Sequence, residues 1–122
     1  MWMFTRFGFF SIVDNSEQTP RTVAVRARCK SHLANLQKAF KLSAKILELP
    51  DRDYGFRIIL STGDWKYIAS EICKDAEQTD NFKERVKTSL PYDYGYAHWL
   101  SLVWGDGRKF QETRIPDHDA TD

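Results

Sequence analysis

The sequence holds few of the features that assign a protein to a functional class at sight. Its two cysteines, Cys29 and Cys73, lie too far apart to form a CxxC unit or another metal-binding spacing. It has no glycine-rich phosphate-binding loop, because Gly105-Asp106-Gly107 is typical of a break after a helix. We therefore expect no metal site and no cofactor, and any function must come from local clusters of side chains.

A long hydrophobic run is also missing. Residues 1–13 are rich in aromatic side chains, but Arg6 interrupts them, no small-residue cleavage site follows, and a membrane span needs about 20 apolar residues. We interpret this segment as part of the mature fold and expect no membrane partner. Because Cys29 and Cys73 lie on or beside apolar helical positions, we expect buried free thiols, which suit a reducing, cytoplasmic location.

A strong net charge of either sign is absent as well. The net charge is +1, which does not by itself indicate nucleic acid or a membrane as partner. The charges are nevertheless uneven, since residues 21–47 contain seven Arg or Lys and no acid, whereas residues 48–80 contain eight acids and four bases. Such asymmetry can mark a polyanion-binding face, and it can equally describe an ordinary solvated surface.

What the sequence does have is enough apolar material for one core. The chain has 122 residues, of which 42% are hydrophobic and 14% aromatic, and this length fits one domain. We expect residues 1–108 to form a single α+β domain. The composition of residues 109–122 is polar and predicts a disordered tail.

The strand signals come in pairs. Residues of the types that favour strands predict strands at 2–13, 22–28, 44–49 and 54–60. Gly8 marks a bulge or bend that divides the first of these runs, and the polar loop 14–21 predicts a hairpin between 9–13 and 22–28.

Helices are expected between and after these strands. Apolar spacing predicts them at 31–42, from Ser61 or Thr62 to Cys73, at 82–90 and at 93–104. Ser31 and Asp80 are the expected N-caps of the first and third helices, and Pro91 ends the third. The order ββαββα predicts an α+β fold with an antiparallel sheet of about four strands, helices packed on one face, and further C-terminal helical segments.

An arginine cluster is the strongest candidate site. Alternation along 22–28 places Arg26 and Arg28 on the face opposite Val23, and Arg57 lies on the matching face of the second hairpin. Guanidinium groups bind phosphate bidentately, so these arginines, with Lys83 joining them, predict a site for nucleic acid, a nucleotide or phosphate. The alternative is that each arginine pairs with an acid such as Glu48 or Asp53.

A second candidate is the aromatic segment 91–99. Its amphipathic side chains are of the types enriched at protein interfaces, and they predict a partner-binding or homodimer patch at Tyr92, Tyr94, Tyr96 and Trp99. The alternative is a helix and its lead-in that close one end of the core. Phe7, Phe9, Tyr54 and Tyr67 could likewise stack on nucleic acid or fill the core.

Signs of catalysis are weak. The histidines His32, His98 and His118 are dispersed, and although Ser11, Tyr54, His32 and Arg28 could meet as an acid/base set, nothing in the spacing indicates it. We assign no catalytic residue. An enzymatic function is less favoured than binding.

Several short pieces spread over nearly the whole chain resemble one family. They are Met1-Trp2-Met3-Phe4-Thr5 with Gly8-Phe9-Phe10-Ser11, Val25-Arg26-Ala27-Arg28, Asp53-Tyr54 with Arg57-Ile58, Asn81-Phe82-Lys83, and Trp104. The set resembles a family of small bacterial and phage proteins to which no activity is assigned. The resemblance implies a stand-alone cytoplasmic domain.

Two hypotheses follow from these observations. The first is a small non-enzymatic binding or regulatory domain that takes an anionic ligand on the arginine-bearing sheet face. The second is a protein-interaction module or inhibitor that acts through the aromatic patch or a sheet edge, and the resemblance to phage proteins links it to host defence.

Overall fold

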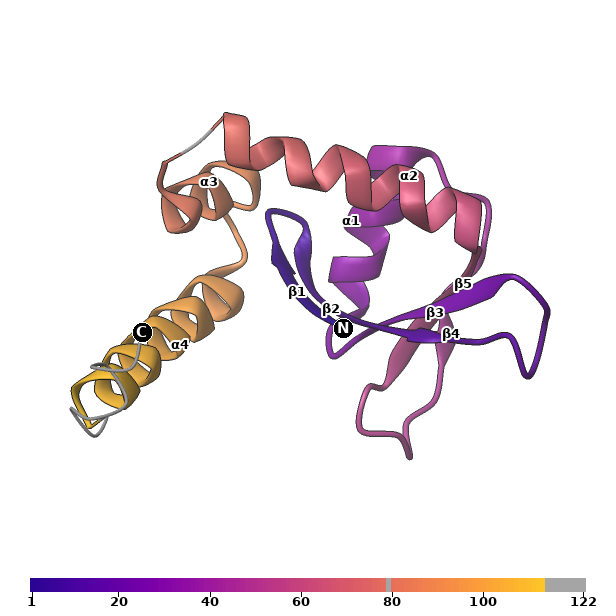
Figure 1. Cartoon of the computed structure of the whole chain (residues 1–122), viewed down its shortest axis with the longest axis horizontal. Coiled ribbons are helices and arrows are strands. Elements are labelled where there is room, and N and C mark those ends of the chain that lie inside the picture. The colour runs from indigo at the N-terminus through magenta and orange to yellow at the C-terminus, as the bar shows by residue number, and fades with distance from the viewer. Residues whose placement is uncertain (79, 114–122) are drawn as a thin grey trace, which may run out of the picture.

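The computed structural model describes residues 1–78 and 80–113. Its elements follow in the order β1 (Trp2–Thr5), β2 (Gly8–Asp14), β3 (Thr22–Ala27), α1 (Lys30–Phe40), β4 (Leu47–Glu48), β5 (Phe56–Ser61), α2 (Thr62–Cys73), a short 3-10 helix (Lys74–Glu77), α3 (Phe82–Ser89) and α4 (Tyr94–Glu112). The predicted α+β class with an antiparallel sheet is confirmed (Figure 1).

The sheet has five strands in the order β1-β2-β3-β5-β4, and every neighbouring pair is antiparallel. The sheet has one strand more than expected because the apolar run 2–13 forms two strands, β1 and β2. They fold back on each other with Thr5 opposite Gly8. β4 is shorter than the predicted strand 44–49. β5 begins at Phe56 rather than at 54, because Leu49 N–H already donates to Gly55 C=O and closes the connecting turn.

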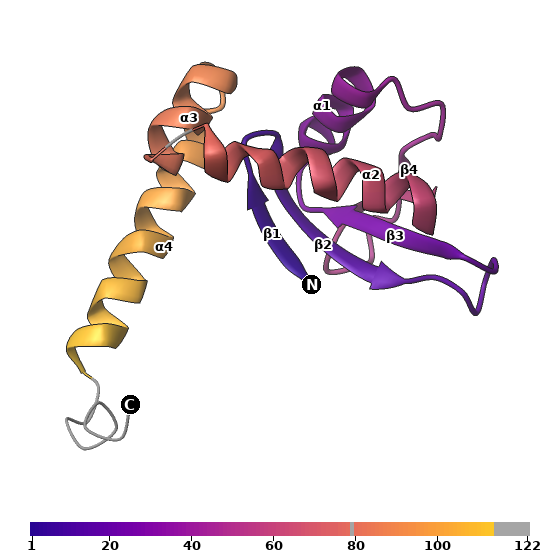
Figure 2. The same cartoon turned by 45° about the horizontal axis from the view of Figure 1, so that its top comes forward.

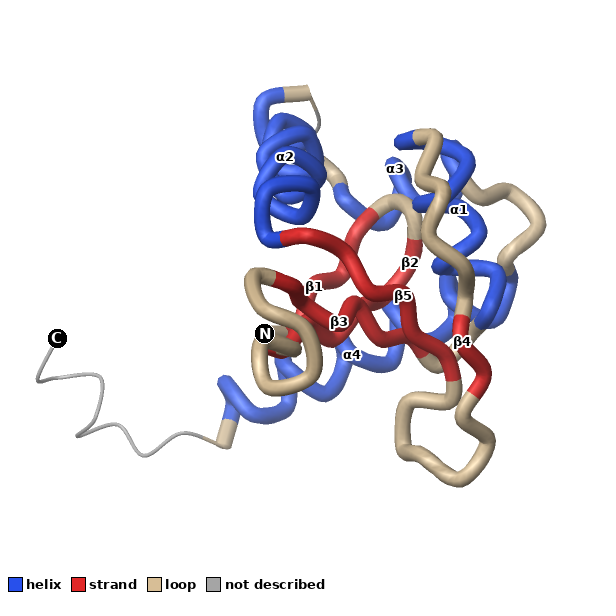
Figure 3. The backbone as a smooth tube through the Cα atoms, turned by 90° about the vertical axis from the view of Figure 1, so that its right-hand side faces the viewer, coloured by secondary structure: helices blue, strands red, loops and turns tan. Residues whose placement is uncertain are grey.

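Helices α1 and α2 cover one face of the sheet (Figure 2). The first core lies beneath them and is built from Phe7, Phe10, Ile12, Val25, Ala27, Leu33, Leu36, Ile58, Leu60, Trp65, Ile68 and Ile72. Helix α2 begins as predicted, because Ser61 Oγ accepts from Asp64 N–H at 3.0 Å. Figure 3 shows the sheet at the centre with the helices around it.

Helices α3 and α4, the C-terminal helical segments of the prediction, do not join the layer that α1 and α2 form. They surround a second core of Phe9, Tyr54, Val86, Tyr96 and Leu100. The cause is the alternation along β2, which turns Phe10 and Ile12 toward the first core and Phe9 toward the second.

Several predicted helix ends also move. Helix α1 begins at Lys30 without a side-chain cap, so Ser31 is not its N-cap, and Asn81 caps α3 in place of Asp80. Helix α4 continues past Gly105 and Gly107, which were expected to break it. Residues 109–112 of the expected tail therefore belong to α4, and residues 114–122 lie outside the described residues.

Gly8 is where the β1–β2 hairpin meets α1. Its φ angle is +144°, and a Cβ added there would overlap the imidazole of His32. A glycine is therefore required both by the backbone conformation and by the closeness of the ring. This contact fixes the distance between the hairpin and the start of α1.

We expect Gly8→Ala to lower the free energy of unfolding by about 2–4 kcal/mol, because it adds backbone strain and a clash with His32. Urea unfolding followed by circular dichroism measures the loss. The matched control is Gly105→Ala, where nothing lies within 4 Å of the added Cβ. In α4 this change should raise stability by up to about 1 kcal/mol, and equal effects of the two variants would contradict the assigned role of Gly8.

Candidate functional site

Arg26 and Arg57 lie directly opposite each other on β3 and β5. Val23 and Phe56 pack against the first core, so alternation places this arginine pair on the other face of the sheet, as predicted. Arg26 Nη2 donates to Ser11 Oγ at 2.7 Å. Among residues 1–78 and 80–113, no ion pair joins Arg26 or Arg57 to a carboxylate.

Arg57 is the less compensated member of the pair. Its Nε is buried and has no hydrogen-bond partner within the described part of the chain. Burial lowers the pKa of Arg57, and the positive charges of Arg26 and Arg52 lower it further. Like charges directly opposite each other in a sheet are destabilising. Among the described residues, no carboxylate pairs with Arg26 or Arg57 to offset this repulsion.

The ring of Tyr54 joins Arg28 to this pair. The guanidinium carbon of Arg26 lies 4.7 Å from the ring centroid, and that of Arg28 lies 4.4 Å from it. Arg28 also pairs with Asp53 at 3.0 Å, which raises the pKa of Arg28. The alternative prediction of an acid partner therefore holds for Arg28, on an exposed and easily solvated pair.

Lys83 does not join the arginines. It lies on α3, and its Nζ is 4.8 Å from the ring centroid of Trp104 on α4. Glu48, the other predicted acid partner, pairs with Lys30 at 2.6 Å. We call Arg26, Arg28, Tyr54 and Arg57 the arginine face.

A pocket of about 190 Å³ adjoins the arginine face. It is lined by Phe9, Arg28, Cys29, His32, Asp93, Gly95, Tyr96 and Trp99. Arg28 belongs to both the pocket and the arginine face, so the two are continuous.

Both cysteines are exposed, which contradicts the expectation of buried thiols. The cause for Cys29 is that α1 begins one residue after it, so Cys29 occupies the N-cap position outside the apolar stripe. Local burial of its sulfur raises the pKa of Cys29, and the charge of Asp93 raises it further. A raised pKa keeps the thiol protonated at neutral pH, so Cys29 is not activated as a nucleophile.

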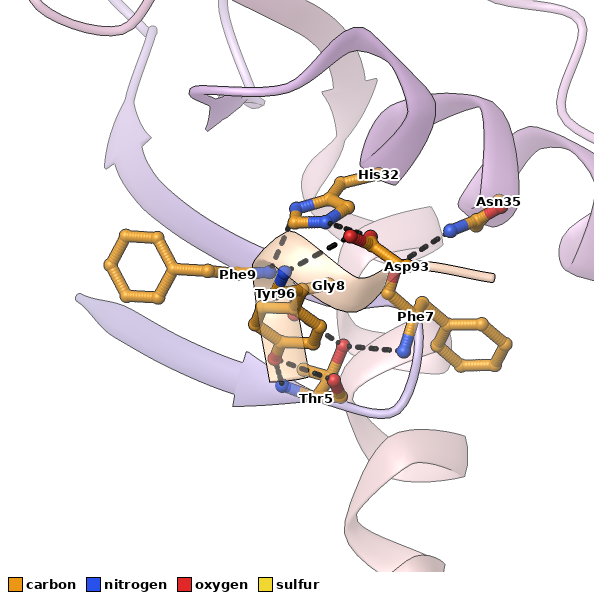
Figure 4. A network of polar contacts seen from close by, with 8 residues as sticks. All are labelled: Thr5, Phe7, Gly8, Phe9, His32, Asn35, Asp93 and Tyr96. Carbon is orange, nitrogen blue, oxygen red and sulfur yellow. Dashed lines mark hydrogen bonds and ion pairs between the residues drawn. The ribbon is translucent and has the colours of Figure 1, made fainter. Parts of the chain in front are cut away.

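His32 forms the inner wall of the pocket and is itself buried. Phe9 N–H donates to its Nδ1 at 3.2 Å, which leaves the ring proton on Nε2, where it faces Asp93 Oδ2 at 2.9 Å (Figure 4). Asp93 in turn caps α4 by accepting from Tyr96 N–H at 3.0 Å. The hydrogen bonds that link β2, His32, Asp93 and the start of α4 therefore hold the residues that line the pocket in place.

Tyr96 connects the same network to the β1–β2 hairpin. Its hydroxyl donates to Thr5 C=O at 2.8 Å and accepts from Thr5 N–H at 3.2 Å (Figure 4). Tyr96 is only 3% exposed, so the structure removes it from the predicted partner patch. Its burial has a physical reason, since the hydroxyl satisfies two backbone groups of the hairpin.

The rest of the aromatic segment divides in two. Tyr92 and Tyr94 are exposed. Trp99 is half-buried, with its ring centroid 5.3 Å from that of Phe4 and 5.0 Å from that of Phe9.

The aromatic residues considered for stacking on nucleic acid also fall into a buried and an exposed group. Phe7, Phe9 and Tyr54 are buried in the two cores, and Tyr67 is exposed on α2.

The acid/base set considered in the sequence analysis comprises Ser11, Tyr54, His32 and Arg28. In the structure its members make other contacts. Both ring nitrogens of His32 are hydrogen-bonded inside the protein, and Ser11 Oγ accepts from Arg26. Tyr54 stacks on the arginines. His32 and Ser11 are thus engaged in hydrogen bonds within the fold and are not presented together as an acid/base pair.

Sequence reasoning missed Asp93 as a site residue. The only available signal was its position at the start of the predicted helical stretch 93–104, which suits an N-cap and says nothing of His32.

No family model, curated protein or solved structure matches the chain. The resemblance to small bacterial and phage proteins therefore stays a prediction. Within the described residues, no helix has both the length and the apolar character needed to cross a membrane.

We expect Tyr96→Phe to lower the free energy of unfolding by about 1–2 kcal/mol at neutral pH, because Thr5 loses its partner. Burial raises the pKa of Tyr96 above its ordinary value. The unfolded chain therefore ionises this hydroxyl first, and above about pH 10 wild-type stability falls by up to about 1.4 kcal/mol per pH unit from this group.

Urea unfolding between neutral pH and pH 11 measures this dependence, which Tyr96→Phe should flatten. Tyr94→Phe is the matched control because Tyr94 is exposed. If Tyr96→Phe and wild type lose stability in parallel above pH 10, Tyr96 does not have the assigned role.

Proposed function

We propose that the protein is a non-enzymatic binding domain that takes a phosphate-bearing ligand on the arginine face. One observation carries the proposal: Arg26 and Arg57 are held opposite each other with no carboxylate paired to either among the described residues. Arg28, by contrast, pairs with Asp53 at 3.0 Å.

A bound anion would relieve two unfavourable features together. It would screen the repulsion between the guanidinium groups of Arg26 and Arg57, and it would supply an acceptor for the buried Nε of Arg57. Phosphate suits this place better than a single carboxylate, because its oxygens can accept from two guanidinium groups at once.

The backbone makes the arginine pair rigid. Both residues stand on paired strands near the centre of the sheet rather than on loops. Arg26 is also held by Ser11 and by the Tyr54 ring. Less side-chain entropy is then lost when the ligand binds.

We expect Arg26→Gln and Arg57→Gln each to weaken binding of inorganic tripolyphosphate by about tenfold or more, because each removes a charged hydrogen bond. Isothermal titration calorimetry at low salt measures the affinity. Arg108→Gln is the matched control, since Arg108 lies on α4, away from the arginine face, and pairs there with Glu112 and the Trp104 ring. Absence of wild-type binding, or equal binding by the two face variants and wild type, would contradict the proposal.

A second candidate function, association with a second copy of the chain, is favoured by α4. Tyr96, Leu100, Val103, Gly107 and Phe110 follow each other at spacings of three or four residues and so share one helix face. The first two are buried in the second core, whereas Val103 and Phe110 are exposed. The apolar face therefore continues beyond the surface that covers it, where α4 projects from the body (Figures 1 and 2).

The projecting half of α4 has little helical stability of its own. A helical segment this short is marginal in water, and Gly105 and Gly107 weaken it further. Its charged residues are two acids and two bases, Asp106, Arg108, Lys109 and Glu112, so two copies do not repel each other. Gly107 adds no side chain at the middle of the face, and two helices could approach closely there.

We expect wild type to self-associate in sedimentation equilibrium, and Phe110→Ser to raise the dimer dissociation constant about tenfold, because a buried aromatic side chain is lost. Leu102→Ser is the matched control, since Leu102 is exposed but lies on a different side of the helix. A wild-type chain that stays monomeric at high micromolar concentration would contradict self-association.

A further inference from the structure

We propose that the pocket beside the arginine face holds the base of a pyrimidine nucleotide whose phosphate lies on the arginines. This inference rests on the proposed function, because the arginine face supplies the phosphate site. The nucleotide could be free or part of a single strand, and the chemistry recognised is the same in both.

The pocket has the size of a single ring. An apolar cavity of about 150 Å³ holds a benzene molecule, and this pocket measures about 190 Å³. A pyrimidine, as a single ring, fits in that volume, whereas a purine adds a second fused ring and leaves less room. The volume therefore favours the smaller of the two classes of base.

The side walls suit a flat ring. Phe9 and Trp99 contact each other edge to face, with centroids 5.0 Å apart, and both line the pocket. Gly95 adds no side chain to the lining. Single-stranded nucleic acids are commonly held by bases stacked on aromatic side chains beside cationic groups.

Asp93 supplies a hydrogen-bond acceptor to a pocket lining that is otherwise largely apolar. Asp93 uses Oδ2 for His32 and Oδ1 for the N–H of Tyr96. Each carboxylate oxygen has a further lone pair, so Asp93 can still accept a hydrogen bond from a ligand. The ring N–H of uracil or thymine, or the amino group of cytosine, is a donor of the required kind.

Arg28 connects the base site to the phosphate site. It lines the pocket, and it shares the Tyr54 ring with Arg26. A nucleotide places its base and its phosphate at opposite ends of a sugar. The order of pocket, Arg28 and then the Arg26–Arg57 pair matches that arrangement.

The test compares four probes by fluorescence-detected binding: uridine monophosphate, oligo-dT and oligo-dA of about ten nucleotides, and tripolyphosphate, which carries no base. We expect wild type to bind oligo-dT about tenfold or more tightly than oligo-dA. Trp99→Leu should remove this preference and leave tripolyphosphate binding unchanged. Tyr94→Leu, at an exposed aromatic outside the pocket, should keep the preference.

Gly95→Leu is a second variant that fills the pocket without removing a core side chain, and it should also remove the preference. Unchanged oligo-dT binding by both Gly95→Leu and Trp99→Leu, or equal wild-type affinity for oligo-dT and oligo-dA, would overturn the base site and leave the phosphate site standing. Absence of tripolyphosphate binding by wild type would instead overturn the proposed function. Binding of uridine monophosphate indicates a free nucleotide, and binding of oligo-dT alone indicates a strand, and both support the base site.

Discussion

The hydrogen-bonded imidazole of His32 is the constraint on which the arrangement of the two cores depends. It accepts from the β2 backbone, faces the N-cap carboxylate of α4, and leaves no room for a side chain at Gly8. A buried polar group is stable only when its hydrogen bonds are satisfied. The same two bonds that satisfy the ring also join the sheet, α1 and α4. The proposed site and the fold therefore share one polar centre, because this ring also lines the pocket.

Most of the fold could be predicted from local patterns. The alternation in 22–28 gave the correct faces of β3, and the spacing from Trp65 to Cys73 identified α2 and its cap. The placement of α3 and α4 could not be predicted, because their apolar stripes show that they pack but not on which surface. Alternation along β2 indicates that Phe9 faces away from α1 and α2, but no local pattern shows that two helices much later in the chain pack against that face. Gly105 and Gly107 suggested a helix end, and helix α4 continues through both.

The candidate site was accessible to sequence reasoning only in part. Arg26 and Arg57 were placed on one face because strand periodicity is local information. Lys83 was grouped with them on charge alone, and charge does not report position, so α3 carries it elsewhere. Asp93 and His32 are separated by 61 residues. No local pattern links them, and the pocket that they line exists only in the folded chain.

The anchoring of Tyr96 on Thr5 also bears on how the molecule avoids aggregation. Sheet edges present backbone groups to which a second chain can add, and proteins limit this hazard by shortening or covering their edges. Here β4 has only two residues, and at the opposite edge the hydroxyl of Tyr96 occupies both backbone groups of Thr5. Docking of α4 thus protects a strand that would otherwise be open at its end. A chain in which α4 had detached would expose that edge together with Phe4, beside the already exposed Trp2, and it would be the species most prone to pair into β-rich aggregates.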